Sequence, residues 1–214
     1  MESREAGKLL KNLGYTFDVV YTSMLERATK TSDLILEEMG LSDQVEVNKH
    51  WKINERHYGS LQGSDKKEMA EVHGKEQVNL WRQSYDNPPP QIHYDHDFHP
   101  RFDPMYANFT EEEHKQMPQG ESLKMVRQRV TPYWEEHIIP RIKAGKSIML
   151  VAHEHVLRGM VQTLTGMDNE SIMKLRLPNA APFVFEFKIS EIGNDVDAKL
   201  KNYYIQDEEK AVSL

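Results

Sequence analysis

The chain has 214 residues, a net charge of −7 with a pI near 5.8, 38% hydrophobic residues and a mean hydropathy of −0.71. This length can build one sizeable core and does not require two domains. The acidic balance argues against nucleic acid as the main partner, and the absence of cysteine excludes disulfides, thiol catalysis and cysteine metal sites. No apolar run approaches the length of a membrane span, and the first ten residues do not resemble a signal peptide. We therefore expect a cytoplasmic protein with no membrane partner.

Hydrophobic periodicity predicts helices that alternate with strands, which indicates an α/β fold. In chain order, the expected elements are a helix from the N-terminus to Gly14, a strand in 15–23, a helix in 25–39 ending at Gly40, short extended pieces at 44–47 and 50–54, and a helix over 66–85. After a polar excursion at 86–120 come a helix over 121–145 interrupted at Pro132 and Pro140, a strand at 149–152, a helix to 164, a strand at 182–187 and a polar tail.

The segment from Ser147 to Leu164 predicts a buried strand that becomes a helix at His153-Glu154-His155. Residues 149–152 are an unbroken apolar run, and apolar residues then recur at helical spacing. The carboxyl end of a buried strand that leads into a helix is a common ligand site in α/β sheets, above all for anions. The two histidines could share a metal ion, but the sequence specifies no third ligand. We therefore favour an anion site or a plain surface turn.

A second turn of the same kind follows the predicted first strand, in "TSMLERATK". Ser23 and Glu26 have the spacing of a capping box, which predicts that Ser23 caps a helix whose first turn includes Arg27. A cation there opposes the helix dipole at a cost of up to about 1 kcal/mol, and a bound anion would reverse that cost. Arg27 alone could be a solvated surface residue. Together with the turn at His153, it predicts a cleft at one edge of the sheet.

The densest group of polar residues is "NERHYGSLQG". Glu55 stands beside Arg56 and His57, whose charges could tune its acidity for general acid or base catalysis. A surface salt bridge with a tight turn would give the same spacing. Lys66 and Arg82 follow as further cations. The histidines of the polar excursion are expected to be solvated rather than to bind a metal: His93, His96 and His99.

Five segments carry a resemblance to a known family: "YTSMLERATKT", "WKINERHYGSLQG", "KEQVNLWRQSYDNPPP", "ESLKMVRQRVTPYWEE" and "LVAH…LRG". Together they are similar to the cofactor-dependent phosphoglycerate mutases of the histidine phosphatase superfamily. The resemblance runs from about Glu5 to the tail. It implies a mainly parallel sheet flanked by helices in a single domain over 1–214, with the excursion at about 86–120 and a C-terminal tail from about 202.

The resemblance also implies a reaction and its partners. The family interconverts 3-phosphoglycerate and 2-phosphoglycerate in glycolysis through a phosphohistidine. It is primed by 2,3-bisphosphoglycerate and uses no metal. Small phosphorylated glycerates are therefore the expected ligands, and a homodimer is expected because the family forms one. Whether mutase, bisphosphoglycerate synthase or phosphatase activity dominates stays open.

Position by position, the resemblance assigns two catalytic residues. Glu55 matches the proton donor and acceptor, and His153 matches the histidine that stabilises charge on the transferring phosphoryl group. The residues that match substrate-contacting positions are Arg27, Arg56, His57, Tyr58, Lys66, Arg82, Gln83, Glu154 and His155.

The chain also departs from the family. The family starts with a strand that ends in Arg-His-Gly and carries the nucleophilic histidine, and these 214 residues contain no Arg-His-Gly. We therefore expect the N-terminal central strand to be absent and the chain alone to be inactive. The family's "HGNS" is "HEHV" here, "WRRSY" contains Gln83, and "LPTGVP" is "LPNAAP".

Three hypotheses follow from these departures. The chain could belong to an active mutase whose start lies upstream of these residues. It could be a catalytically dead pseudoenzyme that keeps the scaffold and a phosphate-ligand site. It could also be a non-catalytic, partner-binding subunit that pairs with a full-length relative. The substitutions in "HEHV" favour the second hypothesis, because a missing start alone would not change them.

Overall fold

The computed structural model describes residues 1–189 and 196–203, and it describes the side chains of 1–189 apart from Lys66. The chain forms two compact units. The sheet unit comprises Met1–Glu55 and Arg129–Leu214, and the inserted unit comprises Arg56–Gln128. That the two act as a single domain stays a prediction.

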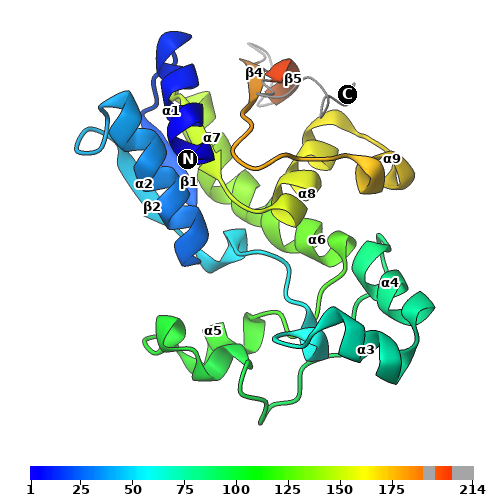
Figure 1. Ribbon diagram of the computed structural model, residues 1–214. Helices are drawn as coiled ribbons and strands as arrows, with labels where there is room; N and C mark the ends of the chain where they lie inside the picture. Colours follow the sequence, from blue (N-terminus) through cyan, green and yellow to red (C-terminus); the bar gives the residue numbers. More distant parts are fainter. Residues whose placement is uncertain (190–195, 204–214) are drawn as a thin grey trace. The chain divides into compact units, whose positions relative to one another are not determined.

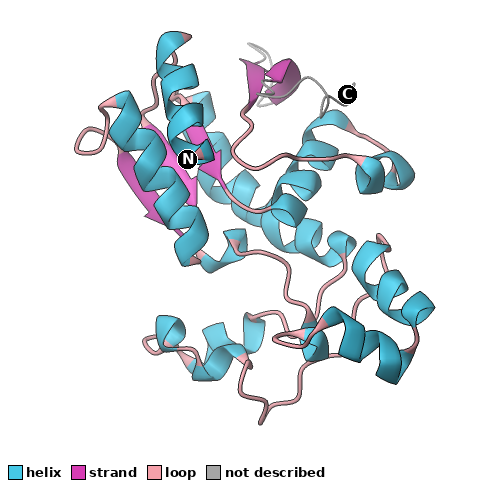
Figure 2. Ribbon diagram, viewed as in Figure 1, coloured by secondary structure: helices cyan, strands magenta, loops and turns pink. Residues whose placement is uncertain are grey.

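The sheet unit is organised around three short parallel strands in the order β2-β1-β3 (Figures 1 and 2). The strands are β1 (Val19–Thr22), β2 (Glu46–Lys49) and β3 (Ile148–Val151). Val19 lies opposite Glu46 on one side and Ile148 on the other. All four residues of β1 are buried, which suits a central strand covered on both faces. A separate antiparallel pair consists of β4 (Phe183–Ile189) and β5 (Val196–Tyr203).

Helices surround the parallel sheet. They are α1 (Glu2–Asn12), α2 (Glu26–Met39), α7 (Ile139–Lys143), α8 (Glu154–Thr165), α9 (Asn169–Lys174) and the C-terminal part of α6 (Leu123–Tyr133). The boundary between the two units falls within α6, between residues 128 and 129. The predicted α/β class, with a parallel sheet flanked by helices, is confirmed.

Helices α1 and α2 pack closely over the sheet. Their buried residues form a core with the strands: Ala6, Leu10, Ile35, Leu36, Met39, Val20, Met149 and Val151. Gly7 permits the close approach of the two helices, because a Cβ there would lie 2.8 Å from the carbonyl oxygen of Ile35. Gly40 ends α2 in the left-handed conformation, as predicted. Leu13, the residue directly after α1, is 46% exposed.

The helical segment after the inserted unit changes its winding at a proline. α6 runs through Pro132, and Trp134–Ile138 forms a π-helical turn before α7 begins. Pro132 has no N–H to donate to the preceding turn, so a helix bond is lost and wider winding becomes favourable. Pro140 lies in the first turn of α7, directly after this π-helical turn. The prediction placed interruptions at Pro132 and Pro140, but the segment stays helical through both prolines, and its winding changes between them.

The inserted unit contains short helices. They are α3 (Lys66–His73), α4 (Lys75–Gln83), α5 (Glu111–Gln116) and the 3₁₀ turns Gly59–Leu61, Pro100–Phe102 and Pro104–Tyr106. The single helix predicted over 66–85 is wrong, because Gly74 adopts a φ of 82° and separates two helices. The expectation of a solvated His99 is also wrong. Its side chain is buried and its ring lies 5.5 Å from that of Tyr94.

Three other local expectations are corrected in the sheet unit. Residues 50–54 do not form an extended piece, because the His50 ring accepts a hydrogen bond from the Lys52 N–H and closes a 3₁₀ turn at Trp51–Ile53. Ser23 does not cap α2, which begins at Glu26 after Leu25. The predicted tail from 202 begins inside β5, and residues 204–214 lie outside the described residues.

Candidate active site

The β3–α8 turn holds His153 between a buried strand and an amphipathic helix. His153 is the N-cap residue of α8, with extended backbone angles (φ −121°, ψ 162°), and its side chain makes no capping bond to its own helix. The imidazole is therefore available to the neighbouring β1–α2 turn. The two turns lie together because β1 and β3 are adjacent parallel strands, whose carboxyl ends meet at the same sheet edge.

Both ring nitrogens of His153 have partners. Arg27 Nε lies 3.1 Å from Nδ1, and Ser23 Oγ lies 2.8 Å from Nε2. An arginine N–H can only donate, so Nδ1 must be the acceptor and carries no proton. In the neutral ring, Nε2 therefore carries the proton and donates it to Ser23. Ser23 Oγ also accepts from the Leu25 N–H at 3.1 Å, which explains why this hydroxyl does not cap α2.

The surroundings of His153 favour its neutral form. The pKa of His153 is lowered to about 4, mainly by burial, with Glu55 opposing the shift and the cations Arg27 and Arg129 adding to it. At neutral pH the ring is thus an uncharged hydrogen-bond donor through Nε2. Such a donor, next to the Arg27 guanidinium and at the start of a helix, suits a phosphate oxygen.

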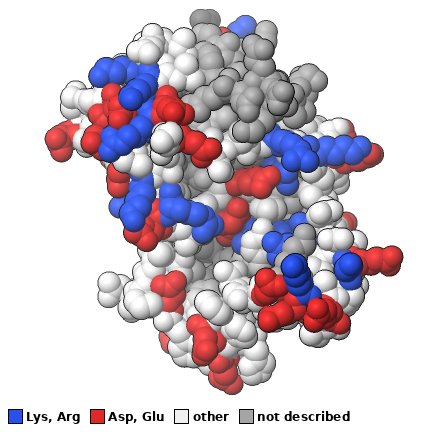
Figure 3. Space-filling view, in the orientation of Figure 1, with Lys and Arg blue, Asp and Glu red and all other residues white. Residues whose placement is uncertain are grey.

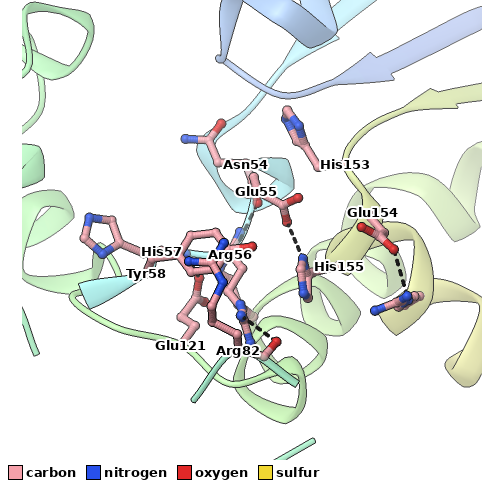
Figure 4. Close-up of polar contacts among 12 residues, drawn as sticks. Asn54, Glu55, Arg56, His57, Tyr58, Arg82, Glu121, His153, Glu154 and His155 are labelled. Carbon is pink, nitrogen blue, oxygen red and sulfur yellow. Dashed lines mark hydrogen bonds and ion pairs between the residues drawn. The ribbon is translucent and has the colours of Figure 1, made fainter. Parts of the chain in front are cut away.

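Glu55 and His155 form a second contact in the sheet unit (Figure 4). Glu55 Oε1 lies 3.3 Å from His155 Nδ1, and the two side chains are only 16% and 8% exposed. Glu55 follows the 3₁₀ turn at residues 51–53, and His155 lies in the first turn of α8. The residue expected to move protons therefore has an imidazole, itself able to carry a proton, within direct reach.

Glu154 turns toward its own helix. Its carboxylate lies 2.7 Å from Arg158 Nη2, one turn along α8 (Figure 4). Arg158 also donates two hydrogen bonds to the Leu175 carbonyl, at 2.7 and 3.0 Å. The negative charge of Glu154, next to His153, is therefore balanced by Arg158, which the Leu175 carbonyl also holds in place.

The inserted unit contains several other residues that were predicted to contact the substrate. Arg56 Nη2 donates to the Arg82 carbonyl at 3.1 Å, and both guanidinium groups lie over the Tyr58 ring, at 4.6 and 5.1 Å from its centroid. The His57 N–H donates to the buried Glu121 carboxylate at 3.0 Å. This arrangement keeps two cations against one aromatic ring.

The structure thus brings together two sets of predicted residues, each within its own unit. Arg27, Glu55, His153 and His155 lie around the carboxyl edge of the sheet, and Arg56, Tyr58 and Arg82 form the second set. Gln83 is the exposed last residue of α4, and Lys66 begins α3, with its side chain outside the described part of the chain. The convergence of both sets on one ligand stays a prediction.

Three residues that contact this site were not predicted as part of it. The position of Ser23 in the β1–α2 turn could have indicated a place in the site, but its spacing from Glu26 indicated a helix cap instead. Asn54 accepts a hydrogen bond from the Met24 N–H at 2.9 Å, and Arg129 donates to three carbonyls of residues 51–54. Contacts between a side chain and a distant backbone leave no spacing pattern that sequence reading could detect.

Other kinds of site find little support among the described residues. They contain no group of three or more His, Asp or Glu side chains arranged to hold a metal ion. Within the same residues, no helix combines the length and apolarity needed to cross a bilayer. Basic and acidic side chains are mixed over the α1–α2 region of the face drawn in Figure 3 rather than gathered by sign. Some of these charges form ion pairs, since Arg4 makes salt bridges with Glu37 and Glu38.

Comparison with known families identifies the group to which the site belongs. The model of the histidine phosphatase superfamily (branch 1) matches residues 1–116 and 94–193. The chain belongs to this superfamily. A 2,3-bisphosphoglycerate-dependent phosphoglycerate mutase from Parabacteroides distasonis is 42% identical over 214 residues, which are 100% of this chain and 82% of that protein. The resemblance inferred from the sequence motifs is therefore confirmed.

Solved structures agree on the fold at lower identity. A mycobacterial glucosyl-3-phosphoglycerate phosphatase has a TM-score of 0.62 at 15% identity, over 95% of this chain and 84% of its own. The alpha-ribazole phosphatase from Shigella flexneri has a TM-score of 0.59 at 22% identity, over 99% and 84% of the two chains. At these identities the likeness supports the fold alone.

Proposed function

We propose that this chain provides the phosphoglycerate-binding and proton-transfer groups of a 2,3-bisphosphoglycerate-dependent phosphoglycerate mutase. The reaction interconverts 3-phosphoglycerate and 2-phosphoglycerate through a phosphohistidine. The observation that carries this proposal is the arrangement at His153, where a neutral imidazole and the Arg27 guanidinium meet at 3.1 Å. The named relative, 42% identical, supports the choice of substrate. A place in glycolysis, the cytoplasm and a homodimer are proposed on the same basis.

The residues of the sheet unit have distinct tasks in this proposal. Arg27 and the His153 Nε2–H hold phosphate oxygens, with the ligand taking the place of Ser23 as acceptor. As charge grows on the oxygens during transfer, these fixed donors stabilise it. Glu55 receives the proton of the glycerate hydroxyl that is phosphorylated and returns one to the hydroxyl that is released. His153 cannot also receive the phosphoryl group, because both of its nitrogens serve these contacts.

The donor set also fits the cofactor. A bisphosphorylated glycerate carries two dianionic groups, and Arg27 and His153 of the sheet unit offer donors for one of them. When bound, 2,3-bisphosphoglycerate supplies the phosphoryl group that primes the nucleophilic histidine. The nucleophile itself is not identified among these 214 residues, which contain no Arg-His-Gly.

The test combines binding and turnover. Calorimetry with 2,3-bisphosphoglycerate should detect binding to the 214-residue chain, and Arg27→Met should weaken it by roughly 10-fold or more. Arg141→Met is the matched control, because Arg141 forms an exposed pair with Glu46 on α7 and β2. Conversion of 3-phosphoglycerate, followed by phosphorus NMR, should be absent in the chain alone. It should appear when the N-terminal segment of the Parabacteroides relative is joined to it. Failure of the 214-residue chain to bind 2,3-bisphosphoglycerate would refute the proposal.

A second candidate function is a catalytically inactive member of the family that still binds phosphorylated glycerates. The contact between Glu55 and His155 favours it, because it engages the proposed proton-transfer residue. In this case the extended protein would bind 2,3-bisphosphoglycerate but would not turn over 3-phosphoglycerate. Activity that appears only after His155→Asn and Glu154→Gly would assign the defect to these two substitutions. A partner-binding subunit would instead gain activity only with a full-length relative.

A further inference from the structure

Arg129 of α6 binds the backbone that leads to Glu55. Its Nη1 donates to the carbonyl of Lys52 at 2.8 Å and to that of Trp51 at 3.4 Å, and its Nη2 donates to that of Asn54 at 3.1 Å. The Asn54 carbonyl belongs to the peptide bond that joins Asn54 to Glu55. One guanidinium therefore satisfies carbonyl groups at the end of the 3₁₀ turn and fixes the backbone up to the residue before the carboxylate.

A second element holds the same segment through a side chain. The buried Asn54 side chain accepts a hydrogen bond from the Met24 N–H at 2.9 Å. Met24 follows Ser23, whose hydroxyl lies 2.8 Å from His153 Nε2. The segment before Glu55 is thus held between α6 and the β1–α2 turn. Its position is set relative to the turns that carry Arg27 and His153.

We infer that Arg129 is the positioning residue that presents Glu55 to His155. The carboxylate lies 3.3 Å from the imidazole (Figure 4), and the backbone directly before it is the one that Arg129 binds. Arg129 acts through the backbone and does not touch the substrate in this assignment. The inference rests on the proposed function only where it gives Glu55 the role of proton transfer.

An arginine is suited to this task by its shape. The guanidinium is a planar fork with several N–H groups in fixed directions, so it can bind carbonyls of successive residues at once. A lysine keeps the charge but has a single donor centre that cannot hold the same set of carbonyls. Arg129→Lys therefore separates the geometric effect of Arg129 from its charge, which also acts on His153.

The test measures the contact between Glu55 and His155 directly and does not require enzyme activity. Nitrogen NMR of the full chain at neutral pH records the ring-nitrogen resonances of His155, and Glu55→Gln gives the resonance positions of an imidazole without its carboxylate. Arg129→Lys should move the His155 resonances most of the way to those positions. Arg141→Lys, an identical change in an exposed ion pair of the same unit, should leave them unmoved. Calorimetry with 2,3-bisphosphoglycerate on the same samples tests the proposed function separately.

One result would overturn the inference: resonances of His155 that stay at their native positions in Arg129→Lys while Glu55→Gln shifts them. If Arg129→Lys does not fold, Arg129→Gln replaces it, because glutamine keeps two amide donors in a plane. The same two outcomes then apply. A fall in melting temperature with an unmoved His155 signal would indicate a role in stability alone.

Discussion

Two neighbouring residues of α8, Glu154 and His155, make contacts of opposite character. Glu154 pairs with Arg158 on the same helix, and its side chain is 47% exposed. His155 pairs with Glu55, which lies 100 positions away in the sequence, and both side chains are largely buried. The motif resemblance matches these two positions to a glycine and an asparagine. The comparison shows that two adjacent residues of one turn can have separate effects. Glu154 contacts a residue of its own helix, whereas His155 contacts Glu55 in the candidate site.

The physical reason for the difference is solvent. The Glu154–Arg158 pair gains little from its charges, because the Glu154 side chain is 47% exposed and water screens it, although Arg158 is only 12% exposed. A buried pair has lost its water, so each partner depends on the other. We therefore expect changes at Glu55 and His155 to alter function and stability, and changes at Glu154 to alter them little.

The largest expected effect is on turnover by the buried pair. In protein that converts 3-phosphoglycerate, Glu55→Gln should lower kcat by roughly 10²–10⁴-fold and change the affinity for 3-phosphoglycerate far less, because it removes a proton-transfer group. Steady-state kinetics with calorimetry measure the two effects. Glu154→Gln, the same chemical change in the exposed pair, is the control. An equal loss of kcat and affinity in Glu55→Gln would mean that Glu55 only organises neighbouring cations.

The second effect concerns His153, the residue that precedes both pairs. Its pKa of about 4 lies below the ordinary 6.5, so below pH 6.5 the unfolded chain binds a proton that the folded chain does not. Above pH 6.5, the ionisation of His153 does not change the free energy of unfolding. As the pH falls from 6.5 to 4, the free energy of unfolding decreases by about 3 kcal/mol in all. Urea unfolding at a series of pH values measures this loss. His153→Gln should flatten the dependence in that window, and an unchanged slope in this variant would contradict the assignment.

Double-mutant cycles should separate the two pairs directly. We expect a coupling free energy of about 1–2 kcal/mol between Glu55 and His155, and about 0.3–0.5 kcal/mol between Glu154 and Arg158. Alanine replacements and urea unfolding supply the four free energies of each cycle. Because Arg158 also holds the Leu175 carbonyl, its single replacement should cost more than its coupling to Glu154. Equal coupling energies would remove the distinction between the pairs.

The smallest effect is expected for Glu154 alone. Glu154→Gln should change the free energy of unfolding by less than about 0.5 kcal/mol, because the Glu154 side chain is 47% exposed and water screens its charge. It should tighten 2,3-bisphosphoglycerate binding by less than about 1 kcal/mol, since Arg158 already balances this carboxylate. Calorimetry measures the change in affinity. A larger gain would mean that Glu154 turns from Arg158 toward the ligand.

The sequence predicted those parts of the site that arise from local pattern. The apolar run before His153 and the helical spacing after it placed this residue at the end of β3, and Gly40 marked the end of α2. Family motifs added Glu55. The 3₁₀ turn at Trp51–Ile53 was missed because it depends on a hydrogen bond to the His50 ring, not on hydrophobic periodicity.

Other features could not be predicted because they depend on distant partners. Ser23 had the spacing of a helix cap, but its hydroxyl lies against His153, which is 130 positions away. Arg129 reads as an ordinary polar residue of α6, and its three acceptors are backbone carbonyls, which every residue possesses. The conformation of Ala180, with a φ of 52°, likewise became visible only in the structure.

The order of strands in the sheet has a consequence for synthesis of the chain. β1 can pair early with β2, but its other neighbour is β3, and the bond from Thr22 Oγ1 to the Val151 carbonyl spans 129 positions. At cellular translation rates this separation corresponds to on the order of ten seconds. During that interval the inserted unit, which is continuous in sequence, can form on the ribosome. The apolar β1 meanwhile has one edge without its native neighbour, and this edge is where a chaperone would most usefully bind the nascent protein.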